Sequence, residues 1–293
     1  MTIIDWTKIK TPNDIKKIPK DTLFDKYESY AGGNSPEIRE GLSDEDVEAA
    51  LHWLELIPDL IGVCLVIGEE GSGKTLLTHA LAYDAKYLFN KLIVLDRPPR
   101  SLFGEYIPFS TEFLKENLAR LQDMADGNGY VAKDGRWMSA RGQVFIRHAV
   151  IGMDEFVRWM PRLNPPAEPK NTLVSLASLN RHLQALFLGI GTELNDFDRH
   201  WFPHVDYIIG CRRIDEPPYD REGSNIQIAG RIQKVKYDRD HDRFIQIGEE
   251  SYICLRASTP RHYLDGYAYK DLFHTDNIQA PRISKSMRLK EDD

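Results

Sequence analysis

One short segment combines glycines, a lysine and a threonine at a spacing that can bind phosphate groups. Residues 68–75 read GEEGSGKT, after an apolar run at 62–67 and before a helical pattern. The glycines let backbone N–H groups turn toward phosphate oxygens, the lysine can reach the β- and γ-phosphates, and the threonine can bind Mg²⁺. The segment therefore predicts a P-loop for ATP. Its expected nucleotide-binding residues are Gly68, Gly71, Ser72, Gly73, Lys74 and Thr75.

A second segment supplies the carboxylates that such a loop requires. Residues 149–155 read AVIGMDE, an apolar strand pattern ending in Asp154 and Glu155. We expect Asp154 to bind the nucleotide-associated Mg²⁺ together with Thr75, and Glu155 to orient and deprotonate the attacking water. A glutamate in this position favours ATP hydrolysis over phosphoryl transfer to a metabolite, so a small-molecule kinase is the less favoured alternative.

The elements that position these residues alternate between strands and helices. Continuous apolar strands separated by amphipathic helices indicate a parallel sheet that is buried on both faces. The predicted fold is an α/β P-loop NTPase of the RecA or additional-strand type, with a mostly parallel sheet and a small β-rich C-terminal appendage. Strands are expected at 62–67, 92–95, 149–153, 186–190 and 207–211, and helices at 43–57, from Lys74, from Thr111 and through 173–183.

Changes in composition and hydrophobic periodicity divide the chain into three parts. Residues 1–36 have little periodicity and end in turn-forming residues, so we interpret them as an N-terminal arm that can dock on a neighbouring copy. Residues 37–215 form the expected ATPase core. Residues 216–293 form the appendage, in which apolar residues on either side of a charged turn at 238–243 predict a β-hairpin, followed by a charged tail.

The third part of the core carries a resemblance to a known family. Residues 180–213 read NRHLQALFLGIGTELNDFDRHWFPHVDYIIGCRR, which resembles the FtsK/HerA group of DNA-pumping ATPases, including viral genome-packaging ATPases. That group has an arginine before an apolar strand, a Thr-Gln pair after it, an Asp-Arg step, and a further strand ending in basic residues. Glu193 departs from the pattern, because the group usually has glutamine there. The matching positions are Arg181, 186–190, Thr192, Asp198, Arg199 and Arg212.

The resemblance implies that a neighbouring subunit completes the catalytic site. Arg181 falls on the position of an arginine finger that reaches the nucleotide of the adjacent subunit, with Arg199 as the reserve candidate, and Thr192 falls on a nucleotide-contacting position. The loop itself supports the need for such a residue, because its variable positions 69–72 read EEGS and contain no cation. Positive charge at the transferred phosphate can raise the rate by about 10³ or more.

The whole-chain composition limits the classes of function. The chain has 293 residues, 42% of them hydrophobic, and a net charge of −7. Contact with a nucleic acid must therefore be confined to a local basic surface. The three cysteines show no paired spacing, which indicates a reducing cytoplasm, the host cytoplasm if the protein is viral. No apolar stretch is long enough to span a membrane, so we expect no membrane partner.

Two segments combine basic and aromatic residues in a way that suits phosphate contacts. We expect nucleic-acid contacts from these segments, although a solvated basic loop describes them equally well. The first contains Tyr130, Lys133, Arg136, Trp137 and Arg141, and the second contains Arg158, Trp159 and Arg162.

These features favour an oligomeric, ring-forming ATPase that translocates double-stranded DNA, most specifically a viral genome-packaging ATPase that acts at a capsid portal. Residues 267–275, YAYKDLFHT, also resemble the segment that follows packaging ATPase cores. One alternative is the ATPase of a terminase-like large subunit that lacks its nuclease. Another is an ATP-dependent phage-assembly or switch protein, resembling the zonula occludens toxin group, that does not pump DNA.

Overall fold

The structure is a computed structural model that describes residues 52–89, 91–96, 106–133, 136–154, 156, 167–214 and 227–256. The arm at 1–36 and the segment 267–275 lie outside the described residues. So do Glu155 and the second basic and aromatic segment, which contains Arg158, Trp159 and Arg162.

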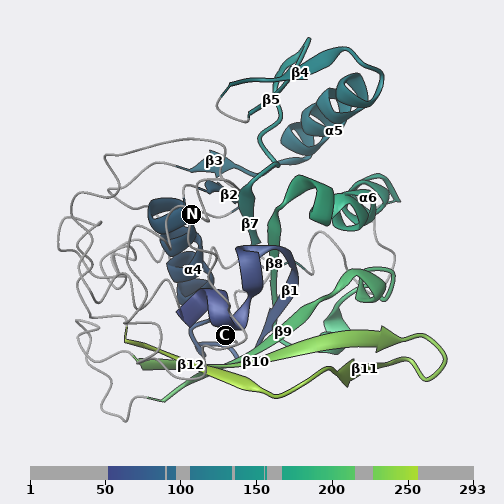
Figure 1. Cartoon of the computed structure of the whole chain (residues 1–293). Coiled ribbons are helices and arrows are strands. Elements are labelled where there is room, and N and C mark those ends of the chain that lie inside the picture. Colours follow the sequence, from purple (N-terminus) through teal and green to yellow (C-terminus); the bar gives the residue numbers. More distant parts are fainter. Residues whose placement is uncertain are drawn as a thin grey trace, which may run out of the picture.

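A large, mostly parallel sheet forms the centre of the molecule, and its strand order is β11-β10-β9-β1-β8-β7-β2-β3 (Figure 1). All five strands that the sequence predicted are present, because each is an apolar run that the sheet buries. The short strand β3 was not predicted. The strands from β9 to β3 are β1 (Gly62–Ile67), β2 (Leu92–Leu95), β3 (Ile107–Pro108), β7 (Ala149–Met153), β8 (Leu186–Gly191) and β9 (Tyr207–Arg213).

The position of β8 identifies the type of fold. The P-loop follows β1 and the acidic pair follows β7, and β8 pairs in parallel with both strands. An additional strand therefore lies between the two strands that carry the phosphate-site segments. This order, together with the loop sequence, confirms the predicted P-loop NTPase fold of the additional-strand type.

Helices cover the two faces of the sheet. Helix α4 (Lys74–Phe89) covers one face, and α5 (Thr111–Ala125) and α6 (Ala167–Leu183) lie on the other (Figure 1). Side chains of β1 alternate between two apolar cores, with Cys64 and Val66 facing α4 and Val63 and Leu65 facing the α5 and α6 side. Both faces are buried, as the continuous apolar strands predict.

The residues before the sheet also contact α4. Residues 52–56 are helical and lead into a short 3-10 turn at Pro58–Leu60, where the expected helix ends. Trp53 is buried in the α4 core, and its indole Nε1 donates a hydrogen bond of 2.8 Å to Asp84 on α4. This contact fixes the entry segment against the helix that begins at the P-loop.

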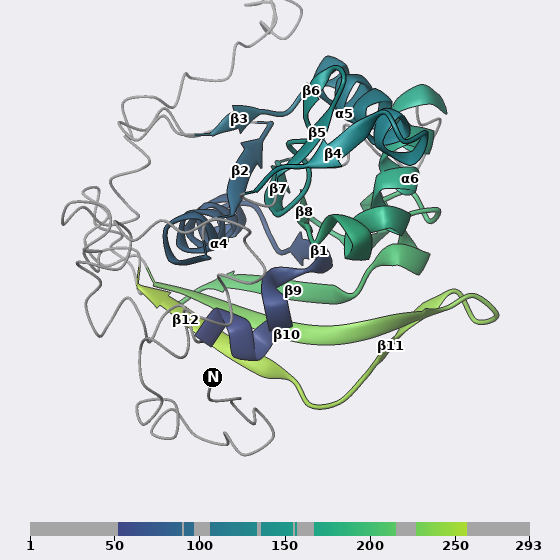
Figure 2. The ribbon, with the colours of Figure 1, turned by 45° about the horizontal axis from the view of Figure 1, so that its top comes forward.

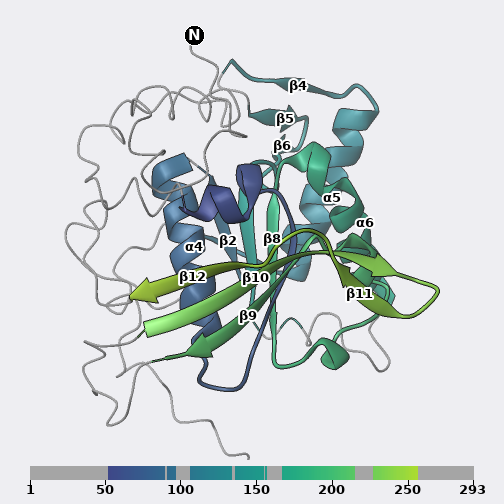
Figure 3. The same ribbon diagram turned by 60° about the horizontal axis from the view of Figure 1, so that its bottom comes forward.

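The predicted C-terminal hairpin is present and extends the central sheet. Strand β10 (Gln227–Asp238) pairs antiparallel with β9 and turns into β11 (Arg243–Gln246). A further strand, β12 (Ser251–Arg256), pairs with the first half of β10 and was not predicted. Figure 3 shows β12, β10 and β9 side by side, in front of the lower part of α4. The proposed domain boundary at 216 stays a prediction.

A small lobe lies between β3 and β7, where the sequence indicated only a basic and aromatic segment. Strands β4 (Gly129–Val131), β5 (Trp137–Ser139) and β6 (Gly142–Gln143) form an antiparallel sheet that contacts α5. Figure 2 shows this sheet beside α5, on the side of the molecule where α6 lies. No helix in the described part of the chain is long and apolar enough to cross a membrane.

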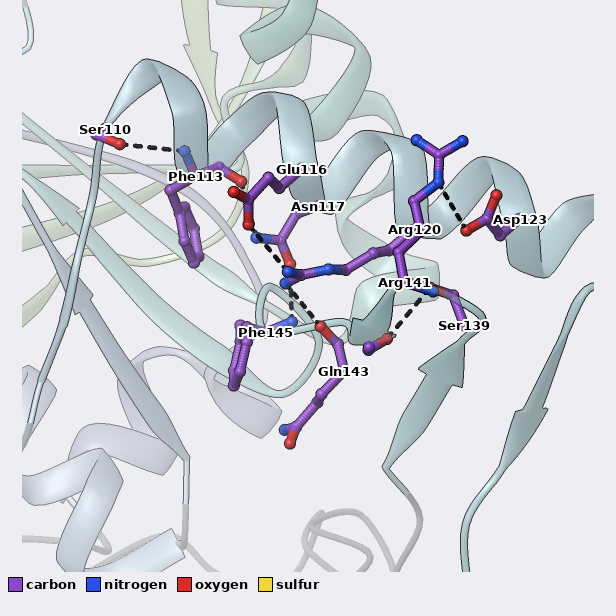
Figure 4. Close-up of polar contacts among 11 residues, drawn as sticks. Ser110, Phe113, Glu116, Asn117, Arg120, Asp123, Ser139, Arg141, Gln143 and Phe145 are labelled. Atoms are coloured by element: carbon purple, nitrogen blue, oxygen red, sulfur yellow. Dashed lines mark hydrogen bonds and ion pairs between the residues drawn. The ribbon is translucent and has the colours of Figure 1, made fainter.

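Polar contacts connect this lobe to α5 (Figure 4). The Asn117 side chain accepts the Phe145 backbone N–H at 2.8 Å and donates to the Phe113 carbonyl at 2.8 Å. Arg120 donates to the Gln143 carbonyl at 3.0 Å. Because Asn117 is fully buried and its amide is held to α5 through Phe113, its hydrogen bond with Phe145 fixes the chain that returns from the lobe to β7.

Candidate nucleotide and magnesium site

The P-loop curls tightly between β1 and α4, and glycine is required at its first position. A Cβ atom on Gly68 would lie 2.3 Å from the backbone oxygen of Cys211, which no side chain can tolerate. At the end of the loop, Gly73 has a φ of +89°, in the region that favours glycine. The loop therefore packs directly against the end of β9 before the helix begins at Lys74.

Lys74 lies across the mouth of this loop. Its Nζ donates to the carbonyl oxygens of Gly68 at 2.7 Å and Glu69 at 2.6 Å. The hydroxyl of Ser72 is buried and has no hydrogen-bond partner among the described residues. A cation held only by carbonyl oxygens and an unpartnered buried hydroxyl both fit a loop that binds an anionic ligand.

Thr75 and Asp154 meet although they are 79 residues apart in the chain. Thr75 lies in the first turn of α4, Asp154 follows β7, and the Thr75 Oγ1 donates to the Asp154 Oδ1 at 3.3 Å. A hydroxyl and a carboxylate are the protein ligands that suit Mg²⁺, which takes its remaining ligands from phosphates and water. The described residues contain no cluster of three or more His, Cys, Asp or Glu side chains that could bind a metal without such help.

Asp96 is a site residue that the sequence reasoning missed. It follows β2 directly, and its Oδ1 accepts the backbone N–H of Asp154 at 2.8 Å. Its own N–H donates to the Gly152 carbonyl at 3.2 Å. The sequence did contain a signal for Asp96, since it is an acidic residue immediately after a predicted buried strand. Parallel strands end at the same edge of a sheet, so this position had to lie near the P-loop and Asp154.

An aromatic cluster holds the chain just after the acidic pair. Phe156 is buried against Trp201 and Phe197, with ring centroids 4.9 Å and 5.7 Å away. Two glycines of β8 leave room for these rings: a Cβ on Gly189 would lie 2.9 Å from Phe156, and one on Gly191 would lie 2.3 Å from Phe197. This packing anchors the chain immediately beyond Asp154. Glu155, the predicted base, lies outside the described residues.

Thr192 and Cys211 flank the P-loop from its two neighbouring strands. Thr192 follows β8, and its carbonyl accepts the Gly68 N–H at 3.3 Å, so the predicted position lies beside the start of the loop. Cys211 on β9 donates its thiol to the Ser72 carbonyl at 3.3 Å. Burial raises the pKa of the Cys211 thiol to about 11, so the thiol stays protonated and can act as this donor near neutral pH.

The two candidate arginines lie at the opposite edge of the sheet. Arg181 is at the end of α6, 85% exposed, and its guanidinium is 4.0 Å from Asp206, which precedes β9. Arg199 forms an ion pair with Asp242 in the β10–β11 turn. The six residues of β1 separate this edge from the P-loop by about 20 Å. Neither arginine can reach the loop of its own chain, and a role in a neighbouring subunit stays a prediction.

Comparisons with known proteins return weak structural similarities. No protein-family model matches the sequence, and the search of curated proteins found no match. The genome-packaging NTPase B204 of Sulfolobus turreted icosahedral virus 2, in complex with AMPPCP, is 12% identical at a TM-score of 0.36, over 64% of this chain and 98% of B204.

Two further solved structures show the same level of similarity. The N-terminal domain of zonular occludens toxin from Neisseria meningitidis is 13% identical at a TM-score of 0.40, over 71% of this chain and 98% of that domain. The KaiC-like protein PH0186 from Pyrococcus horikoshii is 12% identical at a TM-score of 0.34, over 64% of this chain and 83% of PH0186. The fold assignment accordingly depends on the strand order and the loop geometry of this chain.

Proposed function

We propose that the protein binds Mg²⁺-ATP at this site and hydrolyses it. The observation that carries the proposal is the contact between Thr75 and Asp154 across the inserted strand, beside a loop whose Lys74 contacts two carbonyl oxygens and no carboxylate among the described residues. A magnesium ligand pair and a phosphate-binding lysine thus converge at the same edge of the sheet. This combination suits a nucleoside triphosphate better than a single phosphate.

Each group of the chain has a distinct task in this proposal. Backbone N–H groups of the loop bind the phosphates, and Lys74 exchanges its carbonyl partners for β- and γ-phosphate oxygens. Thr75 and Asp154 would hold Mg²⁺, which neutralises charge on the phosphates when bound. Asp96 fixes the backbone of Asp154. Glu155, which follows directly, would orient the attacking water and accept its proton.

We further propose that several copies form a ring that uses ATP to move double-stranded DNA, as a viral genome-packaging ATPase does at a capsid portal. The family resemblance gives Arg181 or Arg199 the role of the catalytic cation, and both lie at the far edge of the sheet, so this role requires a neighbouring subunit. A soluble ring in the cytoplasm, or in the host cytoplasm of a virus, is consistent with the net charge of −7 and the unpaired cysteines.

The test is the ATPase rate with and without long duplex DNA, measured beside the mass of the oligomer. We expect Mg²⁺-dependent hydrolysis that rises when DNA is added, and a ring of several copies. Lys74→Ala is the control, and its turnover should fall by about 100-fold or more because a preorganised cation at the phosphates is lost. Near-normal turnover in Lys74→Ala would overturn the nucleotide-site assignment. A hydrolysis rate that does not change when DNA is added would overturn only the proposed translocase function.

A further inference from the structure

The neighbouring strands β9, β10 and β12 each place one arginine on the same face of the sheet. In antiparallel pairing, directly opposite residues share a face. Ala229 on β10 lies opposite Arg212, and Gln227 lies opposite Arg256. Because side chains alternate along a strand, Arg231 lies on the same face as Ala229 and Gln227. We call Arg212, Arg231, Arg256 and Tyr252 the arginine face.

The other face of the same strands is buried, so the arginine face is the outer one. Ile228 and Ile232 on β10 pack in the apolar core beneath α4. On the arginine face, Arg212, Arg231 and Arg256 are exposed, and Tyr252 is 62% exposed. A Cβ atom on Gly210, which lies opposite Arg231, would have only the Arg231 carbonyl within 4 Å, at 3.9 Å. The described residues leave this surface open.

The arginine face also keeps most of its positive charge. Arg212 and Arg256 form no ion pair with another described residue. Arg231 has one acidic neighbour, Glu250, at 3.8 Å. That carboxylate also accepts hydrogen bonds from Tyr252 at 2.8 Å and Gln233 at 2.7 Å. Three cations and one anion leave an excess of two positive charges on an otherwise acidic protein.

The lobe that the sequence indicated for nucleic-acid contact is less suited to it. Arg141 is 3.3 Å from the carboxylate of Asp123, and Arg120 is 2.9 Å from Glu116 (Figure 4). Trp137 is half-buried, with the Arg147 guanidinium 4.6 Å from its ring centroid. Arg141 is therefore already paired with a carboxylate, and the ring of Trp137 already stacks against Arg147.

We propose that the arginine face binds the sugar-phosphate backbone of duplex DNA. This inference depends on the proposed DNA translocase function and names the surface that would contact the DNA. Exposed arginines neutralise phosphates without reading sequence, which a motor that moves along any sequence requires. The three side chains project from adjacent, hydrogen-bonded strands, so the sheet fixes the spacing of their backbone positions, as a basic loop would not.

The same strands connect the arginine face to the nucleotide site. Arg212 directly follows Cys211, whose thiol donates to the Ser72 carbonyl in the P-loop. The backbone oxygen of Cys211 also packs against Gly68. A change in the P-loop on binding or losing phosphate would be transmitted to Arg212 through one residue. This short path is a physical route by which ATP turnover can alter the affinity of the arginine face for DNA.

The experiment compares two variants that lose the same charge from different surfaces. One carries Arg212→Gln, Arg231→Gln and Arg256→Gln, and the control carries Lys133→Gln, Arg136→Gln and Arg141→Gln. Duplex DNA affinity is measured between 50 and 200 mM salt, beside ATP-analogue affinity and oligomer mass. We expect the arginine-face variant to lose about 10-fold or more in DNA affinity and to have a salt slope shallower by about two, whereas the control changes less than about threefold.

A third variant replaces the same three arginines with lysines and should keep most of the affinity, since it preserves the charge. Equal or larger loss in the lobe variant would overturn the proposal. A parallel loss of ATP-analogue affinity would instead place the arginines at the nucleotide, and a change in oligomer mass with DNA affinity unchanged would make the face a subunit interface. Wild-type protein that binds no DNA at all would remove the translocase function itself.

Discussion

The chemistry of the candidate site depends on residues that neighbouring strands hold in pairs. The P-loop and Asp154 could be predicted from sequence because each belongs to a contiguous motif, and an apolar strand pattern directly precedes each motif. Asp96 could not be assigned in this way, because its contact with the Asp154 N–H exists only once β2 pairs with β7. The aromatic anchor at Phe156 is hidden for the same reason, since Trp201 lies 45 residues further along the chain.

Asp96 should act as a positioning residue for Asp154, the proposed magnesium ligand. Asp96→Asn keeps an oxygen that can accept the Asp154 N–H, so kcat/KM should stay within about threefold of the wild type. Asp96→Ala leaves that half-buried N–H without its partner, which costs about 1–3 kcal/mol and should lower kcat/KM by roughly 5- to 150-fold. The Mg²⁺ concentration for half-maximal rate should rise in the alanine variant alone. An equal loss of kcat/KM in the asparagine and alanine variants would show that the Asp96 charge, rather than its hydrogen bond, is required.

At the scale of elements, burial decides what the sequence reveals. Strands β1, β7 and β8 are apolar throughout because both faces are covered, and this pattern is easy to recognise. The lobe strands have only two or three residues each and are mostly half-buried or exposed, so they are too short to show a periodicity. Strand β12 alternates exposed and buried residues after a turn, and its pairing with β10 depends on contacts that lie far apart in sequence.

The turn that leads from the lobe into β7 should make stability sensitive to acid. His148 has a φ of +54°, and its backbone bonds to both Leu183 and Leu92. Burial, together with the nearby charges of Arg147 and Lys91, lowers the pKa of His148 to about 3. The unfolded chain takes up a proton below about pH 6.5, while the folded protein does not until about pH 3. The free energy of unfolding should therefore decrease as the pH falls through this window, by at most about 1.4 kcal/mol per unit.

His148→Asn tests this expectation, because asparagine does not titrate there and tolerates a positive φ. Urea unfolding at pH 7 and pH 5 should show a smaller acid-induced loss in the variant than in the wild type. His182→Asn, at an exposed position on α6, is the matched control and should leave the difference between the two pH values unchanged. An unchanged acid-induced loss in His148→Asn would assign the sensitivity to other groups, including the fully buried His79.

At the scale of the whole molecule, the candidate site residues lie at two opposite edges of the sheet. The P-loop, Asp154, Asp96 and Thr192 gather where the parallel strands end, and the candidate arginines lie where the strands begin. The sequence could place the first group by motif and by strand ends. It could not show that Arg181 lies about 20 Å from the P-loop of its own chain, because that distance follows from the direction of the sheet. A catalytic role for Arg181 therefore requires a second subunit.

Mixing two inactive variants tests the role of Arg181 in a neighbouring subunit. Arg181→Ala should fold normally, because an exposed ion pair at 4.0 Å contributes little stability. It should bind ATP yet lose about 10³-fold in turnover, since no cation then reaches the transferred phosphate. Lys74→Ala subunits lack a working loop but keep the arginine. A mixed ring contains junctions where an intact loop meets an intact Arg181, so part of the hydrolysis should return.

The control mixes Arg181→Ala with the double variant Lys74→Ala and Arg181→Ala, which has no arginine to contribute and should restore nothing. Mass measurement must show that mixed rings form in both samples, because recovery is possible only at a shared interface. Full activity of Arg181→Ala alone, or mixed rings without recovery, would exclude this residue as the finger. Arg199 would then be the residue to test. Its ion pair with Asp242 holds it at the same edge, so it too could act only on a neighbouring subunit.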